Sequence, residues 1–315
     1  MNMQYGSGKY TYELVEGWAK LPEGTSFLDA CGICVDAQDR VYVLNRSAEH
    51  PVAVFDREGN FLTSWGRGLF KRAHGSGVGP DGAIYCTDDR NHTVRKFTPE
   101  GKLLMTLGNE DRPSDNGYVH DGFDFFWSLT TIAKGSPPFN RPTGVAIAKS
   151  GTIYVADGYG NARVHKFTAD GKLLLSWGEP GYAPGHFRLP HSIYVDKQER
   201  VWIPDRENSR VQIFDSNGKL LDQWENVFRP TDVYIDDEGV VFVSELCLRL
   251  SVFSPDGKLL ARWGTQEKQK ETALFVAPHA IALDSHGDIY VGEVAMTYAK
   301  VDRGPRVLQK FARKS

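Results

Sequence analysis

Short runs of alternating apolar and polar residues recur along almost the whole chain. Residues 189–225 show the pattern well, with four such runs separated by polar turns: LPHSIYVDKQERVWIPDRENSRVQIFDSNGKLLDQWE. Alternation predicts β-strands, and Asp-Gly or Asn-Gly between apolar runs predicts a hairpin turn. Helical periodicity is absent almost everywhere, so the pattern predicts an all-β protein.

This four-strand unit occurs six times. The equivalent first-strand positions are Cys31, His74, Thr143, His191, Thr231 and His279. Four strands in roughly 40 residues is the signature of a propeller blade, so we predict a six-bladed β-propeller. The sixth unit lacks a fourth strand, and the run Tyr10–Ala19 can supply it and close the ring. We therefore expect a single domain over residues 1–315.

One interval between blades is longer than the others. His74 and Thr143 are 69 residues apart, whereas the other intervals are 40 to 48 residues. The extra residues, 109–140, are rich in aromatic side chains. Loops of this length are usually functional lids or disordered, and the aromatic content favours a packed lid. We refer to residues 109–140 as the insertion.

Three equivalent positions carry histidine. His74, His191 and His279 fall in blades two, four and six. The first strand of each blade lines the central channel, and alternate blades are about 120° apart, so three imidazoles would converge on the axis. Three protein ligands with one open position are the pattern of a catalytic zinc site. The simpler alternative is that each histidine merely fills a polar channel.

The loops between second and third strands should open at the same mouth as these histidines, because neighbouring strands are antiparallel. Blade one offers Arg46 there, and blade three offers Tyr159. A phenol close to a metal and a guanidinium is acidified and can act as a base, so these two residues form a candidate pair. The acids that end the second strands have a structural interpretation, since they often bond nearby backbone amides.

Composition narrows the functional classes. There are 37 Lys+Arg and 40 Asp+Glu in 315 residues, giving a net charge of −3, and this balance argues against binding to nucleic acid or to a membrane surface. No stretch approaches the roughly 20 apolar residues of a membrane span. The start of the chain lacks the apolar core of a secretory signal, and four cysteines do not make a disulfide framework. We therefore expect a cytoplasmic protein.

The repeats resemble NHL repeats, and several strings resemble the lyase that completes peptide C-terminal amidation, peptidyl-α-hydroxyglycine α-amidating lyase. These strings are AHGSG at 73–77, RPTGVAI and VADGYGNARVHKF within 141–167, FRLPHSIYV and DRENSRVQIF within 187–214, and APHAIAL at 277–283. The resemblance covers nearly the whole chain. It implies zinc held by three histidines, with a tyrosine base and an arginine beside it.

Matched position by position, the resemblance makes His74, His191 and His279 the metal ligands. Tyr159 becomes the base and Arg46 its partner, while Arg206 in the DREN string would hold a substrate carboxylate. The implied reaction splits a carbinolamide, such as an N-acyl-α-hydroxyglycine, into an amide and an aldehyde such as glyoxylate. Zinc would bind the substrate hydroxyl, and another divalent transition metal is an alternative.

The chain departs from the family at three positions. Ala280 occupies the place of an aspartate that helps to bind a structural calcium, so calcium is not expected here. Gly160 and Ile213 replace the family's disulfide cysteines, which fits an intracellular version. These departures leave the substrate open between a peptide and a smaller molecule.

Two rival functions stay open. The first is a non-enzymatic NHL propeller that binds a protein or ligand on one face. The second is a metal-dependent hydrolase or lactonase on the same propeller. The oligomeric state is not indicated by the sequence.

Overall fold

The described residues form six antiparallel sheets, which are the blades of a β-propeller. A computed structural model describes residues 3–122, 124–264 and 273–314. Five sheets have four strands and the sixth has five. The predicted all-β, six-bladed architecture is confirmed. The contacts group the chain into two compact units, residues 70–230 and residues 1–69 with 231–315.

The unit of residues 70–230 contains blades two, three and four. Blade two consists of β7 (Ala73–Val78), β8 (Ile84–Asp88), β9 (Thr93–Phe97) and β10 (Leu103–Gly108). Blade three consists of β11 (Pro142–Ile147), β12 (Ile153–Asp157), β13 (Arg163–Phe167) and β14 (Leu173–Trp177). Blade four consists of β15 (Tyr194–Val195), β16 (Val201–Asp205), β17 (Arg210–Phe214) and β18 (Leu220–Trp224). A short helix, α1 (Phe125–Thr130), lies in the insertion, and the 3-10 turn η1 (Arg206–Asn208) follows β16.

The other unit contains blades one, five and six. Blade one consists of β3 (Ala30–Val35), β4 (Val41–Asn45), β5 (Val52–Phe55) and β6 (Phe61–Trp65). Blade five consists of β19 (Pro230–Ile235), β20 (Val241–Glu245), β21 (Arg249–Phe253) and β22 (Leu259–Gly264). Blade six consists of β23 (Pro278–Leu283), β24 (Ile289–Glu293) and β25 (Leu308–Arg313) with β1 (Gln4–Ser7) and β2 (Tyr10–Val15). Helix α2 (Ala295–Ala299) and the 3-10 turn η2 (Gly304–Val307) connect β24 to β25. Of the helices in the described residues, none combines the length and hydrophobicity that a membrane span requires.

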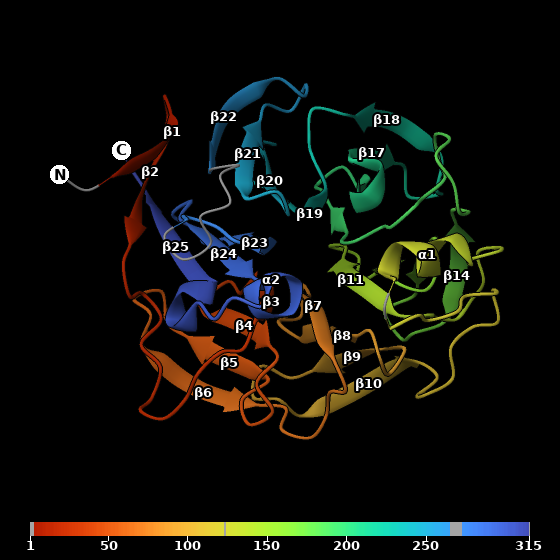
Figure 1. Cartoon of the computed structure of the whole chain (residues 1–315), viewed down its shortest axis with the longest axis horizontal. Coiled ribbons are helices and arrows are strands. Elements are labelled where there is room, and N and C mark those ends of the chain that lie inside the picture. The colour runs from red at the N-terminus through yellow and green to blue at the C-terminus, as the bar shows by residue number, and fades with distance from the viewer. Residues whose placement is uncertain (1–2, 123, 265–272, 315) are drawn as a thin grey trace. The chain divides into compact units, whose positions relative to one another are not determined.

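The sixth blade is completed from the N-terminal end of the chain, as predicted. Strand β2 pairs antiparallel with β25, with Tyr12 opposite Arg313 and Val15 opposite Lys310. In Figure 1 the red strands β1 and β2 run beside the blue β25. Strand β1 was not predicted, because its four residues, QYGS, carry no apolar alternation and remain largely exposed. It extends this blade to five strands by pairing with β2.

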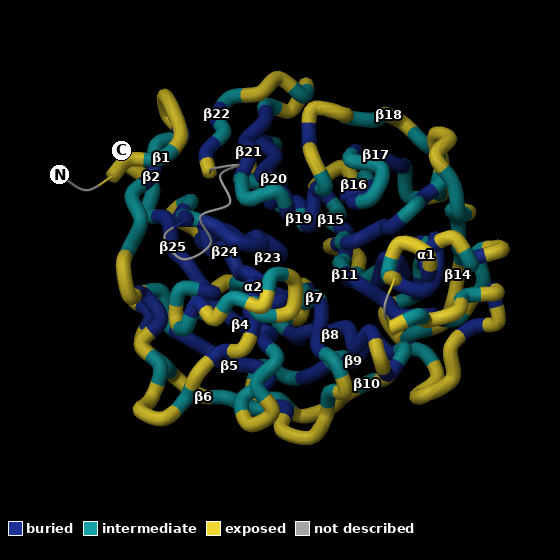
Figure 2. The backbone as a smooth tube through the Cα atoms, viewed as in Figure 1, coloured by how far each residue is buried: buried dark blue, intermediate teal, exposed yellow. Residues whose placement is uncertain are grey.

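Burial falls from the inner strands of each blade to the outer ones. All five residues of every second strand are buried. The fourth strands β6, β10, β14 and β18 are largely intermediate or exposed, and Figure 2 shows them in teal and yellow. Apolar side chains of neighbouring blades share a core, as where Tyr154 of blade three packs with Val201 and Phe214 of blade four. The strand ends near this core are therefore rigid supports for polar side chains.

Each second strand ends in a fully buried polar residue. These residues are Asn45, Asp88, Asp157, Asp205, Glu245 and Glu293, each at most 1% exposed. In blade four, the Asp205 carboxylate accepts hydrogen bonds from the backbone N–H groups of Arg188 and Leu189 at 3.0 Å and from Arg210 Nε at 3.0 Å. The carboxylate thus ties the loop that leads into the blade to its second and third strands. The structural interpretation is confirmed for Asp88, Asp157, Asp205 and Glu293, each of which accepts backbone N–H groups.

Replacing Asp205 with alanine should destabilise the protein severely. Burial raises the pKa of this carboxyl, which marks the cost of placing a charge there. Without it, the buried Arg210 loses its carboxylate partner and two backbone N–H groups lose their acceptor, for a loss of about 3–5 kcal/mol. Urea unfolding followed by fluorescence measures the effect. Asp215→Ala, in an exposed turn of the same blade, is the control and should shift the midpoint far less. Equal shifts for both variants would contradict the role assigned to Asp205.

Candidate metal and catalytic site

Two of the three predicted histidines meet at one tyrosine in the unit of residues 70–230. The Tyr159 hydroxyl lies 3.0 Å from His74 Nε2 and 3.2 Å from His191 Nε2. The imidazole centres of His74 and His191 are 4.9 Å apart. All three side chains are buried, with Tyr159 only 7% exposed. The structure therefore brings together the predicted base and two predicted metal ligands.

The ring orientation of the histidines is set by backbone carbonyl groups. His74 Nδ1 lies 2.7 Å from the carbonyl oxygen of Thr143, and His279 Nδ1 lies 2.8 Å from that of Cys31. A carbonyl oxygen can only accept, so Nδ1 carries the proton and Nε2 keeps its lone pair. This arrangement is the one that metal-binding histidines adopt. With His191, the three buried histidines form a set that could hold a metal ion.

A register shift at the start of the first strand, of the kind that a β-bulge produces, helps to aim His74 and His279. The pairing of β23 with β24 shifts register between Pro278 and Ala280, the residues on either side of His279. The pairing of β7 with β8 shifts between Ala73 and Ser76, a stretch that includes His74. Bulges redirect side chains and recur beside functional sites. His191 was predicted to lie on the first strand of blade four, but that strand, β15, is only Tyr194–Val195, and His191 precedes it. The backbone N–H of His191 still donates to the Pro204 carbonyl of the second strand at 2.8 Å.

Three guanidinium groups surround the Tyr159 ring. Their central carbons lie 5.5 Å from the ring centre for Arg141 and Arg206 and 5.7 Å for Arg72. Arg206 Nη1 also donates to the Tyr159 hydroxyl at 3.4 Å. Sequence reasoning found Arg206 but missed the other two arginines. Both sit just before a first strand, a position that the histidine alignment did not consider.

Arg206 is held in place by a neighbouring acid. Its Nε donates to Glu207 at 2.7 Å, and Glu207 also accepts from Arg229 at 2.7 Å. These cations lower the pKa of the Glu207 carboxyl despite its burial, so this acid stays ionised. Within the part of the chain that the structure describes, Arg206 bonds through Nε and one Nη1 hydrogen, and its other N–H groups could bind a carboxylate.

Arg46 lies in the other unit, at the end of β4. Its Nη1 pairs with Asp29 at 3.1 Å and donates to the Thr297 hydroxyl at 2.6 Å. Its side chain is 9% exposed. The assignment of Arg46 to Tyr159 stays a prediction, as does the assignment of roles to all these residues.

The insertion packs directly on Tyr159, as its aromatic content predicted. Leu129 and Ile132 form one buried cluster with Tyr159 and Leu189. Phe125 of α1 meets the Tyr159 ring edge-on at 5.7 Å. Helix α1 itself was not predicted, since a six-residue helix gives no periodic signal. It begins after the N-cap Asp124, whose carboxylate accepts a hydrogen bond from the Trp127 N–H at 2.9 Å.

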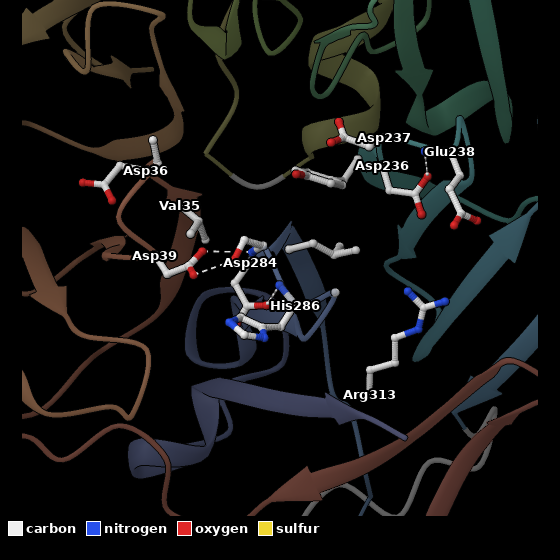
Figure 3. Close-up of a pocket in the computed structure, with 14 residues that line it drawn as sticks. Val35, Asp36, Asp39, Asp236, Asp237, Glu238, Asp284, His286 and Arg313 are labelled. Atoms are coloured by element: carbon white, nitrogen blue, oxygen red, sulfur yellow. Dashed lines mark hydrogen bonds between the residues drawn. The ribbon is translucent and has the colours of Figure 1, made fainter. Parts of the chain in front are cut away.

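A cavity of about 430 Å³ lies elsewhere, in the unit of residues 1–69 and 231–315. Figure 3 shows the acids and the Arg313 side chain around it. Several of these acids are already bonded within the fold, as where Asp39 accepts from Ser285. Leu283, at the end of β23, lines this cavity, whereas His279 lies at the beginning of that strand. Four steps along the strand separate the two residues by roughly 13 Å, so this cavity does not include His279.

Asn116 is the hydrogen-bonding centre of the insertion. It is 1% exposed, its Nδ2 donates to Gly160 O at 2.6 Å, and its Oδ1 accepts from Tyr118 N–H at 3.0 Å. Asn116→Ala should therefore loosen the insertion by about 1–3 kcal/mol. Trypsin cleavage within residues 109–140, followed by mass spectrometry, should accelerate relative to the wild type. Asn109→Ala, an exposed asparagine of the same segment, is the control. Unchanged cleavage of Asn116→Ala would show that the hydrogen bonds of Asn116 are not needed to hold the insertion.

Comparisons with known proteins agree with this architecture. The family model of the NHL repeat matches residues 139–167 and 187–214. Human NHL repeat-containing protein 3 is 31% identical over 307 residues, covering 91% of this chain and 82% of that protein. Peptidyl-α-hydroxyglycine α-amidating lyase 2 of Drosophila melanogaster is 28% identical over 319 residues, covering 90% and 73%. A solved structure of streptogramin B lyase has a TM-score of 0.60 and 16% identity, covers 98% of this chain and 90% of its own, and supports the fold alone.

Proposed function

Because the chain belongs to the family of NHL-repeat β-propellers that includes NHL repeat-containing protein 3, and is related to the α-amidating lyases, we propose that it is a zinc-dependent lyase. Its substrate would be a carbinolamide, either an N-acyl-α-hydroxyglycine or a related α-hydroxy amide. The products would be an amide and an aldehyde, such as glyoxylate. The observation that carries the proposal is the Tyr159 hydroxyl within 3.2 Å of two histidine nitrogens.

The residues present suit a transition metal better than calcium. His74, His191 and His279 would hold it through neutral imidazole nitrogens, which favour zinc, whereas calcium prefers oxygen ligands. Ala280 supplies no carboxylate for calcium. When bound, zinc would act as a Lewis acid that makes the substrate hydroxyl easier to deprotonate. Another divalent metal would supply similar chemistry.

The chain's own groups would then move one proton. Tyr159 would accept the proton of the substrate hydroxyl, with Arg46 and Arg206 stabilising the phenolate. The C–O bond becomes a carbonyl as the C–N bond breaks. The departing amide nitrogen takes back the proton from Tyr159, so no water is consumed. Arg206, which has N–H groups to spare, would bind the substrate carboxylate, and the insertion would keep water away from the reacting atoms.

Metal content is the first test. Plasma mass spectrometry of protein purified without a histidine tag should give about one zinc per chain. His191→Ala should lose most of this metal, because two imidazoles bind far more weakly than three. His186→Ala, which changes a histidine in a loop of the same blade, should retain it. No metal in the wild type, even after zinc is supplied, would favour the non-enzymatic binding propeller.

Turnover tests the role of Tyr159. The loaded enzyme should release glyoxylate from N-benzoyl-α-hydroxyglycine, whereas a lactonase would instead consume water. Tyr159→Phe should lower kcat by about 100-fold or more and leave the metal content unchanged, because only the proton acceptor is lost. A Tyr159→Phe variant with full kcat would remove Tyr159 from the mechanism.

From the composition we also propose a cytoplasmic location, and a small-molecule or peptide-like substrate with no nucleic acid or membrane partner. Fractionation of the native host with an antibody to the protein would test the location.

A further inference from the structure

Arg141 connects the insertion to the proposed catalytic tyrosine. Its guanidinium carbon lies 5.5 Å from the ring centre of Tyr159 and 5.9 Å from that of Tyr118, which belongs to the insertion. Its Nη1 also donates to the Tyr118 hydroxyl at 2.8 Å. The Arg141 side chain is only 7% exposed. A single buried cation thus contacts one tyrosine of the site and one of the insertion.

The surroundings of Arg141 hold its charge in place. Asp89 is fully buried, and its carboxylate lies 3.2 Å from Arg72 and 4.0 Å from Arg141. His120 of the insertion stacks on Tyr118, with its Nδ1 3.4 Å from Arg141 Nη1. Burial and the nearby arginines lower the pKa of His120, which keeps this ring neutral and able to accept. One acid, two arginines and two rings of the insertion therefore form a connected network.

The backbone at Arg141 is unusual. Its φ of +68° places it in the left-handed region, which is unfavourable for a residue with a Cβ atom. Arg229, at the equivalent Arg-Pro-Thr position of blade five, has a φ of +49° and lies 5.7 Å over Phe126 of α1. Strained conformations persist where the surrounding structure enforces them, often at functional sites. Two equivalent arginines thus adopt this conformation, and each contacts an aromatic ring of the insertion.

We propose that Arg141 is a positioning residue of this site, which fastens the insertion over Tyr159 through Tyr118. Fastening keeps Phe125 against the Tyr159 ring and against Arg206, whose guanidinium lies 5.6 Å over Phe125. The insertion would then define the substrate pocket only while Arg141 is in place. The fastening stands on geometry alone, and only its kinetic consequence rests on the proposed lyase function.

Hydrogen–deuterium exchange of the full-length protein tests the fastening directly. The N–H groups of Val119, Asp121 and Ala133 are bonded within the insertion and report its closure. Arg141→Lys keeps the charge but loses the planar fork, and should speed exchange in residues 117–133 about tenfold. Tyr118→Phe should speed it several-fold, because it removes one hydrogen bond and keeps the ring.

Arg200→Lys is the matched control. Arg200 also stacks on an aromatic ring, 5.2 Å over Trp202, and pairs with Asp196, but it lies in a turn of blade four. The Arg200→Lys variant should leave hydrogen–deuterium exchange in the insertion unchanged. Exchange in Arg141→Lys within about twofold of the wild type would overturn the proposal. So would faster exchange spread equally over all blades. If Arg141→Lys fails to fold, the same criteria apply to Tyr118→Phe.

Kinetics separate a positioning role from a general structural one. Tyr118→Phe should raise KM for N-benzoyl-α-hydroxyglycine about tenfold and keep kcat within about threefold, with metal content unchanged. A fall in kcat together with loss of metal would instead indicate damage to the whole site and would count against positioning. If the wild type releases no glyoxylate, the lyase proposal fails, and the exchange measurement still decides whether Arg141 fastens the insertion.

Discussion

The blades depend on the buried polar residue that ends each second strand. In blades two, three, four and six this residue is an acid that accepts backbone N–H groups from the segment leading into the blade, as Asp157 does from Asn140. It also meets a polar partner on or next to the third strand, such as His165 or Arg210. Burying a charge is costly unless several donors meet it. Because the donors come from three segments, the carboxylate fixes where each of these four blades begins.

The candidate site is built on that fixed point. The start of the first strand and the loop after the second strand are both tied to the same acid, and these segments carry the histidines and Tyr159. In blade three, Asn161 bonds Asp157 at 2.8 Å and Ser136 O at 2.6 Å, which joins the Tyr159 loop to the end of the insertion. The positions of the histidines and Tyr159 are therefore set by the hydrogen bonds at the ends of the inner strands. The outer strands, which are half exposed, contribute little to it.

The repeat explains what the sequence could predict. The blade count, a closing strand within Tyr10–Ala19 and the equivalence of His74, His191 and His279 all follow from aligned repeats; the strand itself is Tyr10–Val15. The surroundings of Tyr159 do not, because they come from departures from the repeat. Arg141 reaches the ring through a left-handed backbone, and Phe125 reaches it from a six-residue helix inside the insertion. Neither leaves a periodic signal. Strand β1 was not predicted for the same reason: its four residues carry no apolar alternation, and it is defined by its pairing with β2.

The bulge at the start of the first strands has an evolutionary consequence. Register shifts also flank Cys31 and Thr143, which are equivalent to the histidines in blades one and three. At four of the six equivalent positions, Cys31, His74, Thr143 and His279, the backbone is thus prepared to present a side chain, whatever that side chain is. A propeller of this kind can gain, lose or exchange ligands by single substitutions without rebuilding a strand. Related chains that share the scaffold would then differ in chemistry according to which of the six positions carry histidine.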